Sequence, residues 1–537
     1  MKFKKPSYQL ILGVIIFLGA LLRVVGINSS ETGFYVDEAA LGYNAKSLIE
    51  TGTDEYGQAW PLAFRSFGDF KSPLFIYSAI PLVKLLSIPL GVRLTSALWG
   101  IVTIYWTAEL AREMIKKKEK AKWVGLIAGL TLALSPWHIN LSRHAIEAVM
   151  ATAFWSLGLL MLIRKKYPAG IVALSLAALS YHSAKYAVPL LLLTLAGWQV
   201  VNKKIKIKRI DKKWLIAGVA LVVMLAINLQ PFSNARAGGV SLFGVNGWLK
   251  TVRDVAASYL AYFSPRVLNL GDWQVRNSIT GVDNVPVTVL ILFYIGIYQT
   301  IKRLIEKREE KELILLSALL LSPLPASATI DPFHSIRSLI MVVPLTVMAG
   351  VGGSWLMEKV NKKKLKMVNL VVVALVIWQT LLLTERILVQ NTMVCYEDWA
   401  WGYEELINKT IELETDKYQA IYVDTTDASA IYSTWLVFGE VETSEKIPHE
   451  NGYYEPVKWQ SPEKLVIKGG KTINFKEIYW PKDQLKENTL YIGSYKRFDE
   501  TALEKAGAEV VEEIKDKTGK TWWMIVATPK ESVLELD

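Results

Sequence analysis

Cysteine and histidine are scarce in this sequence. Its 537 residues include one cysteine, Cys395, and five histidines. One cysteine cannot form an intrachain disulfide or build a cysteine-based metal site. The histidines are scattered along the chain, which disfavours a multi-histidine metal centre. A divalent metal ion stays open as a cofactor, because His334 and Asp69 could supply two ligands. Two ligands fall short of a site, however, and the sequence requires no cofactor.

The chain also lacks a glycine-rich nucleotide loop, an internal repeat and a basic domain with aromatic stacking surfaces. Its net charge is +11, which in a soluble protein could indicate a nucleic-acid partner. The lysines and arginines lie instead in short clusters between apolar runs, the pattern of cytoplasmic loops in membrane proteins. We therefore expect membrane lipids around the chain and no nucleic acid bound to it.

Long apolar runs are what the sequence has in abundance, and 52% of its residues are hydrophobic. Spans of roughly 20 residues are long enough to cross a bilayer as helices, which predicts about eleven transmembrane helices. The first run follows MKFKK and lacks a signal-peptide cleavage pattern, so we expect an uncleaved first helix. The runs lie near residues 8–27, 92–113, 122–140, 147–163, 168–182, 184–201, 213–230, 285–302, 311–328, 338–357 and 367–384.

Basic clusters fall on alternate connections between these runs. The positive-inside rule then predicts a multi-pass protein of the plasma membrane with a cytoplasmic N-terminus and an extracytoplasmic C-terminal domain. The clusters are MKFKK (1–5), KKKEKAK (116–122), RKK (164–166), NKKIKIKRIDKK (202–213), KRLIEKREEK (302–311) and EKVNKKKLK (358–366).

Two regions outside the predicted spans complete the expected architecture. The first outer loop, 28–91, contains the apolar stretch PLFIYSAIPLVKLLSIPL, which its prolines and Lys84 mark as a helix lying in the membrane interface. The polar tail alternates strand-like and helix-like runs, which predicts a small α/β domain. The strand-like runs are QAIYVDT, TLYIGSY and TWWMIVAT, the helix-like runs are WAWGYEELINKTIELE and ETALEKAG, and KDKTGKTWW is typical of a hairpin turn. We expect a mainly α polytopic membrane protein with a transmembrane domain over 1–384 and an extracytoplasmic α/β domain over 385–537.

Two adjacent carboxylates, Asp37 and Glu38, open an amphipathic stretch in that first loop. The apolar spacing over 37–50 predicts a surface helix, and Asp37 could simply cap it. A carboxylate at a helix N-terminus also stays ionised, because it feels the positive end of the helix dipole. An ionised carboxylate at a dry membrane boundary can act as a general base, so capping and catalysis are compatible roles.

Further ionisable residues lie at the outer ends of the predicted spans. Taken singly, each basic residue could be an interfacial side chain that extends its charge to water. Together they predict a polar outer cavity, because ionisable groups at that depth are costly unless they face one. The Lys and Arg residues favour an anionic ligand such as phosphate. The residues are Asp69, Lys71, His138, Arg143, His144, Glu147, Tyr181, His182, Lys185, Asp331, His334 and Arg337.

Five segments of the chain resemble motifs of the GT-C glycosyltransferases that use polyprenyl-phosphate sugars, in particular the protein O-mannosyltransferase and lipid A aminoarabinose transferase group. The resemblance covers roughly residues 8–410 and favours the bacterial branch. Two departures are the sequence Lys71-Ser72-Pro73 in place of a Lys-Pro-Pro motif, and the absence of a predicted β-trefoil in the tail. The segments are YVDEAALGYNAKSL, GDFKSPLFIY, SPWHINLSRHAIEA, PASATIDPFHSIRSL and WAWGYEEL.

The resemblance implies an inverting transfer of a sugar from a polyprenyl-phosphate donor to a lipid, glycan or protein hydroxyl on the extracytoplasmic side. It implies Asp37 as the general base, with Glu38 and Glu147 as possible supporting residues. The missing nucleotide loop fits a lipid-linked donor. The expected phosphate ligands are Lys71, Arg337, Arg143 and Lys185, and the expected cavity residues are Asp69, His144, Tyr181, His182 and His334.

Two other functions stay open from the sequence. An inactive relative could serve as a membrane-anchored carbohydrate-binding scaffold. Its contacts would be the tail tryptophans Trp399, Trp401, Trp459, Trp480, Trp522 and Trp523, which could equally be packed in the core of the domain. A lipid-linked sugar transporter is the second alternative. Transporters tend to carry charges at the bilayer midplane and to have repeated halves, neither of which the sequence displays.

Overall fold

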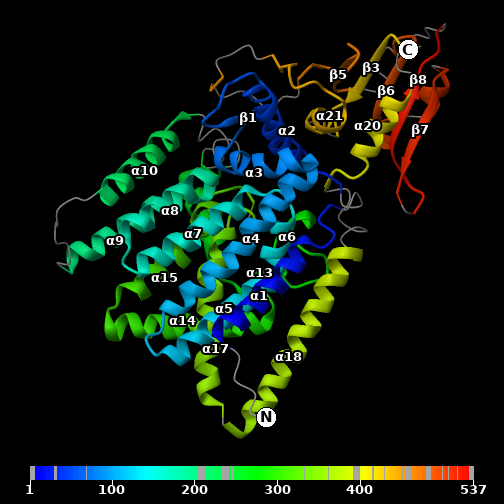
Figure 1. Ribbon diagram of the computed structural model, residues 1–537. Helices are drawn as coiled ribbons and strands as arrows, with labels where there is room; N and C mark the ends of the chain where they lie inside the picture. Colours follow the sequence, from blue (N-terminus) through cyan, green and yellow to red (C-terminus); the bar gives the residue numbers. More distant parts are fainter. Residues whose placement is uncertain are drawn as a thin grey trace. The chain divides into compact units, whose positions relative to one another are not determined.

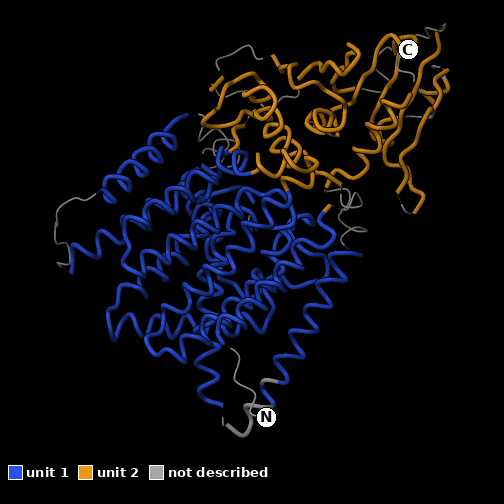
Figure 2. The backbone as a smooth tube through the Cα atoms, in the orientation of Figure 1, with its two compact units in different colours: residues 1–27, 72–78, 93–395 blue, residues 28–71, 79–92, 396–537 orange. Residues whose placement is uncertain are grey.

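The structure is a computed structural model, and the chain divides into two compact units (Figures 1 and 2). Unit 1 comprises 1–27, 72–78 and 93–395, and unit 2 comprises 28–71, 79–92 and 396–537. The structure describes residues 7–28, 33–67, 69–202, 212–231, 241–243, 247–331, 333–360, 362–390, 399–413, 417–427, 430–448, 453–454, 462–478, 485–498, 500–505, 507–516 and 518–530. Cys395 lies outside these residues.

Unit 1 is built of helices. Each of the eleven predicted apolar runs is helical over most of its length, and the run at 122–140 forms two helices, α5 and α6. Short helical segments connect them, of which the longest are α12 (Trp248–Ala261), α13 (Pro265–Leu270) and α16 (Leu324–Ser327). The helices of the apolar runs are α1 (Tyr8–Val24), α4 (Ile88–Glu113), α5 (Lys118–Ala133) with α6 (Pro136–Arg143), α7 (Glu147–Ile163), α8 (Tyr167–Ser180), α9 (His182–Val201), α10 (Lys212–Asn228), α14 (Val287–Lys307), α15 (Glu310–Leu321), α17 (Val342–Lys359) and α18 (Lys362–Glu385).

Five described helices are long and apolar enough to cross a membrane by themselves. The bent pair α5 and α6 makes a sixth, with an angle of 54° between its halves. Pro136 lacks a backbone N–H and therefore interrupts the helix there, while the Ser135 hydroxyl accepts the N–H of His138 at 3.3 Å. The protein is thus a mainly helical polytopic membrane protein, and the other predicted spans are shorter or less apolar helices than this criterion requires.

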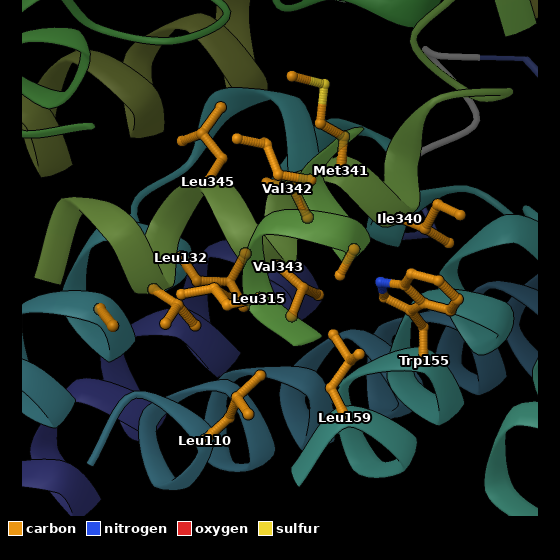
Figure 3. Close-up of a cluster of buried hydrophobic side chains, with 14 of the residues drawn as sticks. Leu110, Leu132, Trp155, Leu159, Leu315, Ile340, Met341, Val342, Val343 and Leu345 are labelled. Carbon is orange, nitrogen blue, oxygen red and sulfur yellow. The ribbon is translucent and has the colours of Figure 1, made fainter. Parts of the chain in front are cut away.

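A buried apolar core holds the helices of unit 1 together (Figure 3). Side chains from α4, α5, α7, α15 and α17 meet in it, including Trp155 and Met341. Helices α14 and α17 approach most closely at two glycines. A Cβ atom on Gly296 would lie 1.9 Å from the Met348 carbonyl oxygen, and one on Gly352 would lie 2.0 Å from that of Leu292. Such small residues let membrane helices pack backbone against backbone.

Ion pairs join the basic connections that the sequence predicts to be cytoplasmic. They link the α4–α5, α7–α8, α14–α15 and α17–α18 connections or the helix ends beside them, so these connections lie at one end of the helix bundle. This grouping is what alternation of the basic clusters requires. The pairs are Lys116–Glu309 at 2.8 Å, Lys120–Glu358 at 2.6 Å and Arg164–Glu113 at 2.8 Å.

Unit 2 begins with the first loop. Helix α2 (Val36–Thr51) is followed by a short antiparallel hairpin of β1 (Phe64–Ser66) and β2 (Asp69–Lys71), in which Phe64 pairs with Lys71. Helix α3 (Pro73–Leu85), whose residues up to 78 belong to unit 1 and whose remaining residues belong to unit 2, forms over the apolar stretch for which a helix is predicted. The placement of α3 in the membrane interface stays a prediction.

A six-stranded mixed sheet forms the C-terminal part of unit 2, in the order β4-β5-β3-β6-β8-β7. The central strands β5, β3 and β6 are parallel, and the remaining neighbours are antiparallel. The elements are α20 (Tyr403–Glu412), β3 (Ala420–Asp424), α21 (Tyr432–Phe438), β4 (Lys464–Val466), β5 (Thr472–Lys476), β6 (Thr489–Ser494), α22 (Glu500–Lys505), β7 (Glu509–Lys515) and β8 (Thr521–Ala527).

The predicted strands at β3, β6 and β8, the helices at α20 and α22 and the hairpin turn before β8 are confirmed. The prediction missed β4, β5, β7 and α21, whose sequences are short or mix apolar and charged residues. The predicted carbohydrate contacts at Trp459 and Trp480 lie outside the described residues.

The first loop and the C-terminal segment share one hydrophobic core. Tyr43 of α2 and Phe67 of the hairpin pack in it with Leu406, Tyr432 and Trp435 of the C-terminal segment. The prediction placed the whole first loop in a domain over 1–384, whereas most of the loop clusters with residues 396–537. Contacts between segments almost 400 residues apart produce this grouping, and no local pattern in the sequence encodes them.

Candidate active site

Helix α2 presents the two adjacent carboxylates differently. Tyr35 occupies the N-cap position, so Asp37 is the second residue of the helix and does not cap it. Glu38 closes the helix start instead, because its carboxylate accepts the backbone N–H of Tyr35 at 3.2 Å. The expectation that Asp37 is the capping residue is therefore wrong, and the buried Glu38 has that part. Both carboxylates still lie in the first turn, where the helix dipole favours negative charge.

Asp37 forms an ion pair with Lys71 of the hairpin. The lysine side chain is buried and the aspartate side chain is about one-third exposed, at 5% and 32%. The ammonium group of Lys71 also lies 5.3 Å from the centre of the Phe67 ring, a cation–π contact that helps to fix its place. The structure thus brings together the predicted base and the first predicted phosphate ligand, with the carboxylate as the more accessible partner.

Two other predicted residues near this hairpin make local contacts. Asp69 accepts the N–H of Phe70 at 2.7 Å and lies buried in β2. Within unit 1, Glu147 at the start of α7 accepts the N–H of Ser72 at 3.2 Å. Ser72 directly follows Lys71 in the sequence. This contact of Glu147 therefore restrains the backbone next to the lysine.

A cavity of about 470 Å³ in unit 1 gathers three of the predicted residues, Tyr181, His182 and Arg337. Its remaining lining is largely apolar and comes from α9, α12, α16 and their connections. The guanidinium group of Arg337 is fixed by the Asp331 carboxylate at 2.5 Å and the Thr329 hydroxyl at 2.9 Å. A mostly apolar cavity with one anchored cation suits a molecule that combines an apolar body with an anionic group.

The other predicted basic residues differ in what they contact. Lys185 lies 3.2 Å from the Nδ1 atom of His182, so it belongs to the same polar group as the cavity. Arg143 is buried and donates to the carbonyl oxygens of Leu22 at 3.1 Å and Val25 at 2.8 Å. These contacts satisfy carbonyls at the C-terminal end of α1, which gives Arg143 a structural part that the sequence did not suggest.

His144 and His334 lie apart from the cavity lining. His144 is buried beside Arg143 in the sequence. The backbone N–H of His334 donates to the Tyr262 hydroxyl at 3.0 Å, and its ring lies 3.9 Å from the Asp272 carboxylate. Within the described ranges, no three His, Cys, Asp or Glu side chains converge on a point that could hold a metal ion.

Sequence reasoning missed several buried ionisable residues, among them Arg23, Arg93 and Glu55. Arg23 donates to the carbonyls of Gly19 at 2.8 Å and Ala133 at 3.1 Å, and Arg93 donates to that of Ile27 at 3.2 Å. Glu55 is buried in unit 2. The signal for Glu55 was present, because Asp54-Glu55 is a second acidic pair in the same loop as Asp37-Glu38.

Comparison with known proteins finds the fold among solved structures only. No protein-family model and no curated protein matches the sequence. The structure is similar to ArnT from Cupriavidus metallidurans bound to undecaprenyl phosphate, with a TM-score of 0.54 at 11% identity over 96% of this chain and 97% of that chain. ArnT in the apo state gives a TM-score of 0.53 at 12% identity, with coverages of 97% and 98%.

A weaker likeness is found to the archaeal oligosaccharyltransferase AglB from Archaeoglobus fulgidus, in complex with an inhibitory peptide and a dolichol-phosphate. Its TM-score is 0.47 at 13% identity, over 82% of this chain and 64% of that chain. The ArnT likeness extends over almost the full length of both chains. The resemblance to GT-C glycosyltransferases is therefore confirmed at the level of the fold.

Proposed function

We propose that the protein is a membrane glycosyltransferase that moves a sugar from a polyprenyl-phosphate donor to a hydroxyl acceptor. The observation that carries the proposal is the ion pair between Asp37 and Lys71, which sets a carboxylate that is about one-third exposed against a buried ammonium group. A base for the acceptor and a cation for the leaving phosphate are the two groups that such a transfer needs. The ArnT fold supports this reading, because one of the ArnT structures holds undecaprenyl phosphate.

In the proposed reaction, Asp37 takes the proton of the acceptor hydroxyl while that oxygen attacks the anomeric carbon of the donor sugar. A new glycosidic bond forms, the bond from the anomeric carbon to the phosphate oxygen breaks, and the configuration inverts. The phosphate leaves with the bonding electron pair, and Lys71 stabilises its added charge. General-base assistance contributes roughly 10²–10⁴-fold to such a rate, and holding the two substrates in line contributes further.

The cavity of unit 1 supports a lipid-linked donor. Apolar side chains such as Tyr186, Leu190 and Phe243 could contact an isoprenoid chain, and Arg337 could contact its phosphate. We propose Arg337 as a phosphate ligand because it lines the cavity. We propose Lys71 as a phosphate ligand because it pairs with the proposed base. Lys185 is a weaker candidate for a phosphate ligand, because its link to the cavity is indirect, through its contact with His182. Arg143 donates to backbone carbonyls, so we propose a structural role for it.

The proposal is tested with purified protein in lipid nanodiscs, supplied with polyprenyl-phosphate sugars and a panel of lipid, glycan and peptide hydroxyl acceptors. We expect release of polyprenyl phosphate that depends on the acceptor and yields an inverted product. Binding of the donor without release would favour a carbohydrate-binding scaffold. In proteoliposomes, movement of the intact donor between leaflets without cleavage would favour a transporter.

The same reaction requires a defined orientation, which we propose from the basic clusters. The N-terminus is expected in the cytoplasm, and the domain over 385–537 is expected outside, with transfer on the extracytoplasmic face of the plasma membrane. Reporter fusions after Lys166 and Asp537 test this arrangement. An outside signal at Lys166 or an inside signal at Asp537 would refute it.

A further inference from the structure

Glu55 is a buried carboxylate, and no described residue meets full hydrogen-bond geometry at either of its oxygens, although the Asn44 side chain lies close enough to interact with the carboxylate. Its residue is only 1% exposed, although carboxylates are almost never fully buried unless they are paired. The chain enters this position directly after α2, and the Glu55 N–H donates to the Asn44 side chain at 3.0 Å. The backbone is therefore held in place while the carboxyl group lacks the partners that an ionised form would require.

The surroundings of Glu55 are polar but incompletely bonded. The Tyr43 hydroxyl and the Nη1 atom of Arg65 are also buried, without partners of full hydrogen-bond geometry in the described part of the chain. Buried polar groups without such partners are uncommon in folded proteins and call for an explanation. Ionisable groups on several elements interact electrostatically with Glu55. They are Tyr43 of α2, the chain neighbours Asp54 and Tyr56, Lys71 of β2, Tyr432 of α21 and Lys446 of the C-terminal segment. The guanidinium group of Arg65 in β1 lies 5.4 Å from the centre of the Tyr56 ring.

Two of these groups are lysines that attract the Glu55 charge, Lys71 and Lys446. Lys446 is fully engaged elsewhere, because its three protons are used by Ser47 at 2.9 Å, Thr51 at 3.1 Å and the Asp54 carbonyl at 3.1 Å. Lys71 is the other cation, and Asp37 is its ion-pair partner. Two carboxylates of unit 2 therefore compete for the ammonium group of Lys71.

We propose that Glu55 is a positioning residue for Lys71: as a neutral acid it leaves the ammonium group to Asp37 and to the donor phosphate. This inference rests on the proposed function. An ionised Glu55 would attract Lys71 in competition with Asp37 and would add a second negative charge to the surroundings of the lysine. A protonated Glu55 does neither.

The electrostatics agree with this geometry. Burial, followed by the charge of Asp54, raises the pKa of Glu55 well above its usual value. Because its pKa is higher in the folded than in the unfolded state, the folded protein holds the proton more tightly. The stabilisation from protonated Glu55 is then complete below the unfolded pKa, about 4.3, and is lost as pH rises through the folded pKa.

The first experiment measures this proton without any transfer assay. Thermal unfolding of the full-length protein in nanodiscs is followed from pH 5 to pH 9 for the wild type, Glu55→Gln and the control Glu50→Gln. Glu50 lies in α2 with its carboxylate on the Thr443 hydroxyl at 2.6 Å. We expect the melting temperature of the wild type and of Glu50→Gln to fall with pH relative to that of Glu55→Gln. Parallel curves for all three proteins would overturn the proposal.

The second experiment asks whether the proton of Glu55 matters to the phosphate site. The Kd for undecaprenyl phosphate is measured at pH 6 and pH 9, and the ratio of the two values is compared between the wild type and Glu55→Gln. The titration of the phosphate is common to both proteins and cancels in the comparison. We express the result as the Kd at pH 9 divided by the Kd at pH 6. We expect this ratio to be at least about threefold smaller in Glu55→Gln than in the wild type, because ionisation of one group changes binding by up to tenfold per pKa unit.

The outcomes separate this inference from the function beneath it. Equal ratios in a protein that binds the lipid phosphate would overturn the role of Glu55 and leave the proposed function standing. A protein that binds no lipid phosphate at either pH would overturn the proposed function and, with it, the role of Glu55 toward a donor. The unfolding curves would then still report whether the residue is a neutral acid.

Discussion

The two units use buried charge for opposite purposes. In unit 1, Arg23, Arg93 and Arg143 donate to backbone carbonyls at the ends of helices. In unit 2, the buried Lys71 meets the carboxylate of Asp37, and its charge also acts on Glu55. A guanidinium group keeps its proton at any physiological pH, so these arginine contacts do not titrate. Carboxylates exchange protons readily, so the groups around Lys71 can change protonation state during a reaction.

Arg337 is the informative exception in unit 1. It pairs with a carboxylate, Asp331, and lines a cavity instead of satisfying carbonyls. The difference suggests a practical criterion for buried cations in this protein. A cation that ends on backbone oxygens supports the fold, and one that ends on a carboxylate beside an accessible space is a candidate for ligand binding.

The substitution Asp37→Asn should produce the largest effect. Asn keeps the shape and the helix, which Glu38 closes, but it cannot accept a proton. We expect the transfer rate, measured per folded protein, to fall by about 10²-fold or more. The melting temperature should fall as well, because the buried Lys71 loses the opposite charge of its partner. Glu38→Gln, which retains an oxygen for the Tyr35 N–H, serves as the control. Near-normal turnover of Asp37→Asn would show that unit 2 does not supply the base.

Next in size is the loss of a cation that pairs with a carboxylate. Lys71→Gln and Arg337→Gln should each weaken the binding of a polyprenyl phosphate by about 1.5–3 kcal/mol, the range for a hydrogen bond to a charged group. Isothermal titration or native mass spectrometry provides the measurement. Lys84→Gln is the matched control, because Lys84 is an exposed lysine of α3. Unchanged affinity in both variants would place the phosphate ligands elsewhere.

The substitution Arg143→Met tests a cation that contacts backbone carbonyls instead of a carboxylate. It removes the donors to the carbonyls of Leu22 and Val25, so we expect unfolding to become easier by about 1.5–3 kcal/mol. Affinity for the lipid phosphate, measured per folded protein, should change much less than in Lys71→Gln. A large loss of affinity without a loss of stability would return Arg143 to the phosphate site and would break the distinction between the units.

The smallest predicted change tests the helix packing of unit 1. Gly296→Ala places a methyl group against the backbone of α17, which must shift, and overpacking of this kind costs about 1–3 kcal/mol. Gly218→Ala in α10 is the control, because a Cβ atom there meets no described atom within 4 Å. Thermal unfolding of the two variants should differ clearly. Equal stabilities would mean that α14 and α17 separate easily.

The sequence by itself determined the helices of unit 1 and much of the C-terminal fold. Apolar runs form helices because each run satisfies its own backbone hydrogen bonds, a local requirement that a membrane makes strict. The strands at β3, β6 and β8 were readable because their apolar and β-branched residues are local signals. Asp37 and Lys71 were identified from their residue types and motifs, and they lie only 34 residues apart, at the start of α2 and at the end of the hairpin.

Tertiary structure decided what those residues contact. Whether Glu38 or Asp37 closes α2 depends on one residue of register at the helix start. From the sequence, Arg143 is predicted to be a phosphate ligand. In the structure it donates to carbonyl oxygens at the end of α1, about 120 residues earlier in the chain. The union of the first loop with the C-terminal segment, and the burial of Glu55 within it, arise from packing between residues separated by most of the chain. Local propensities and periodicities carry no record of such partners, so only the folded chain identifies them.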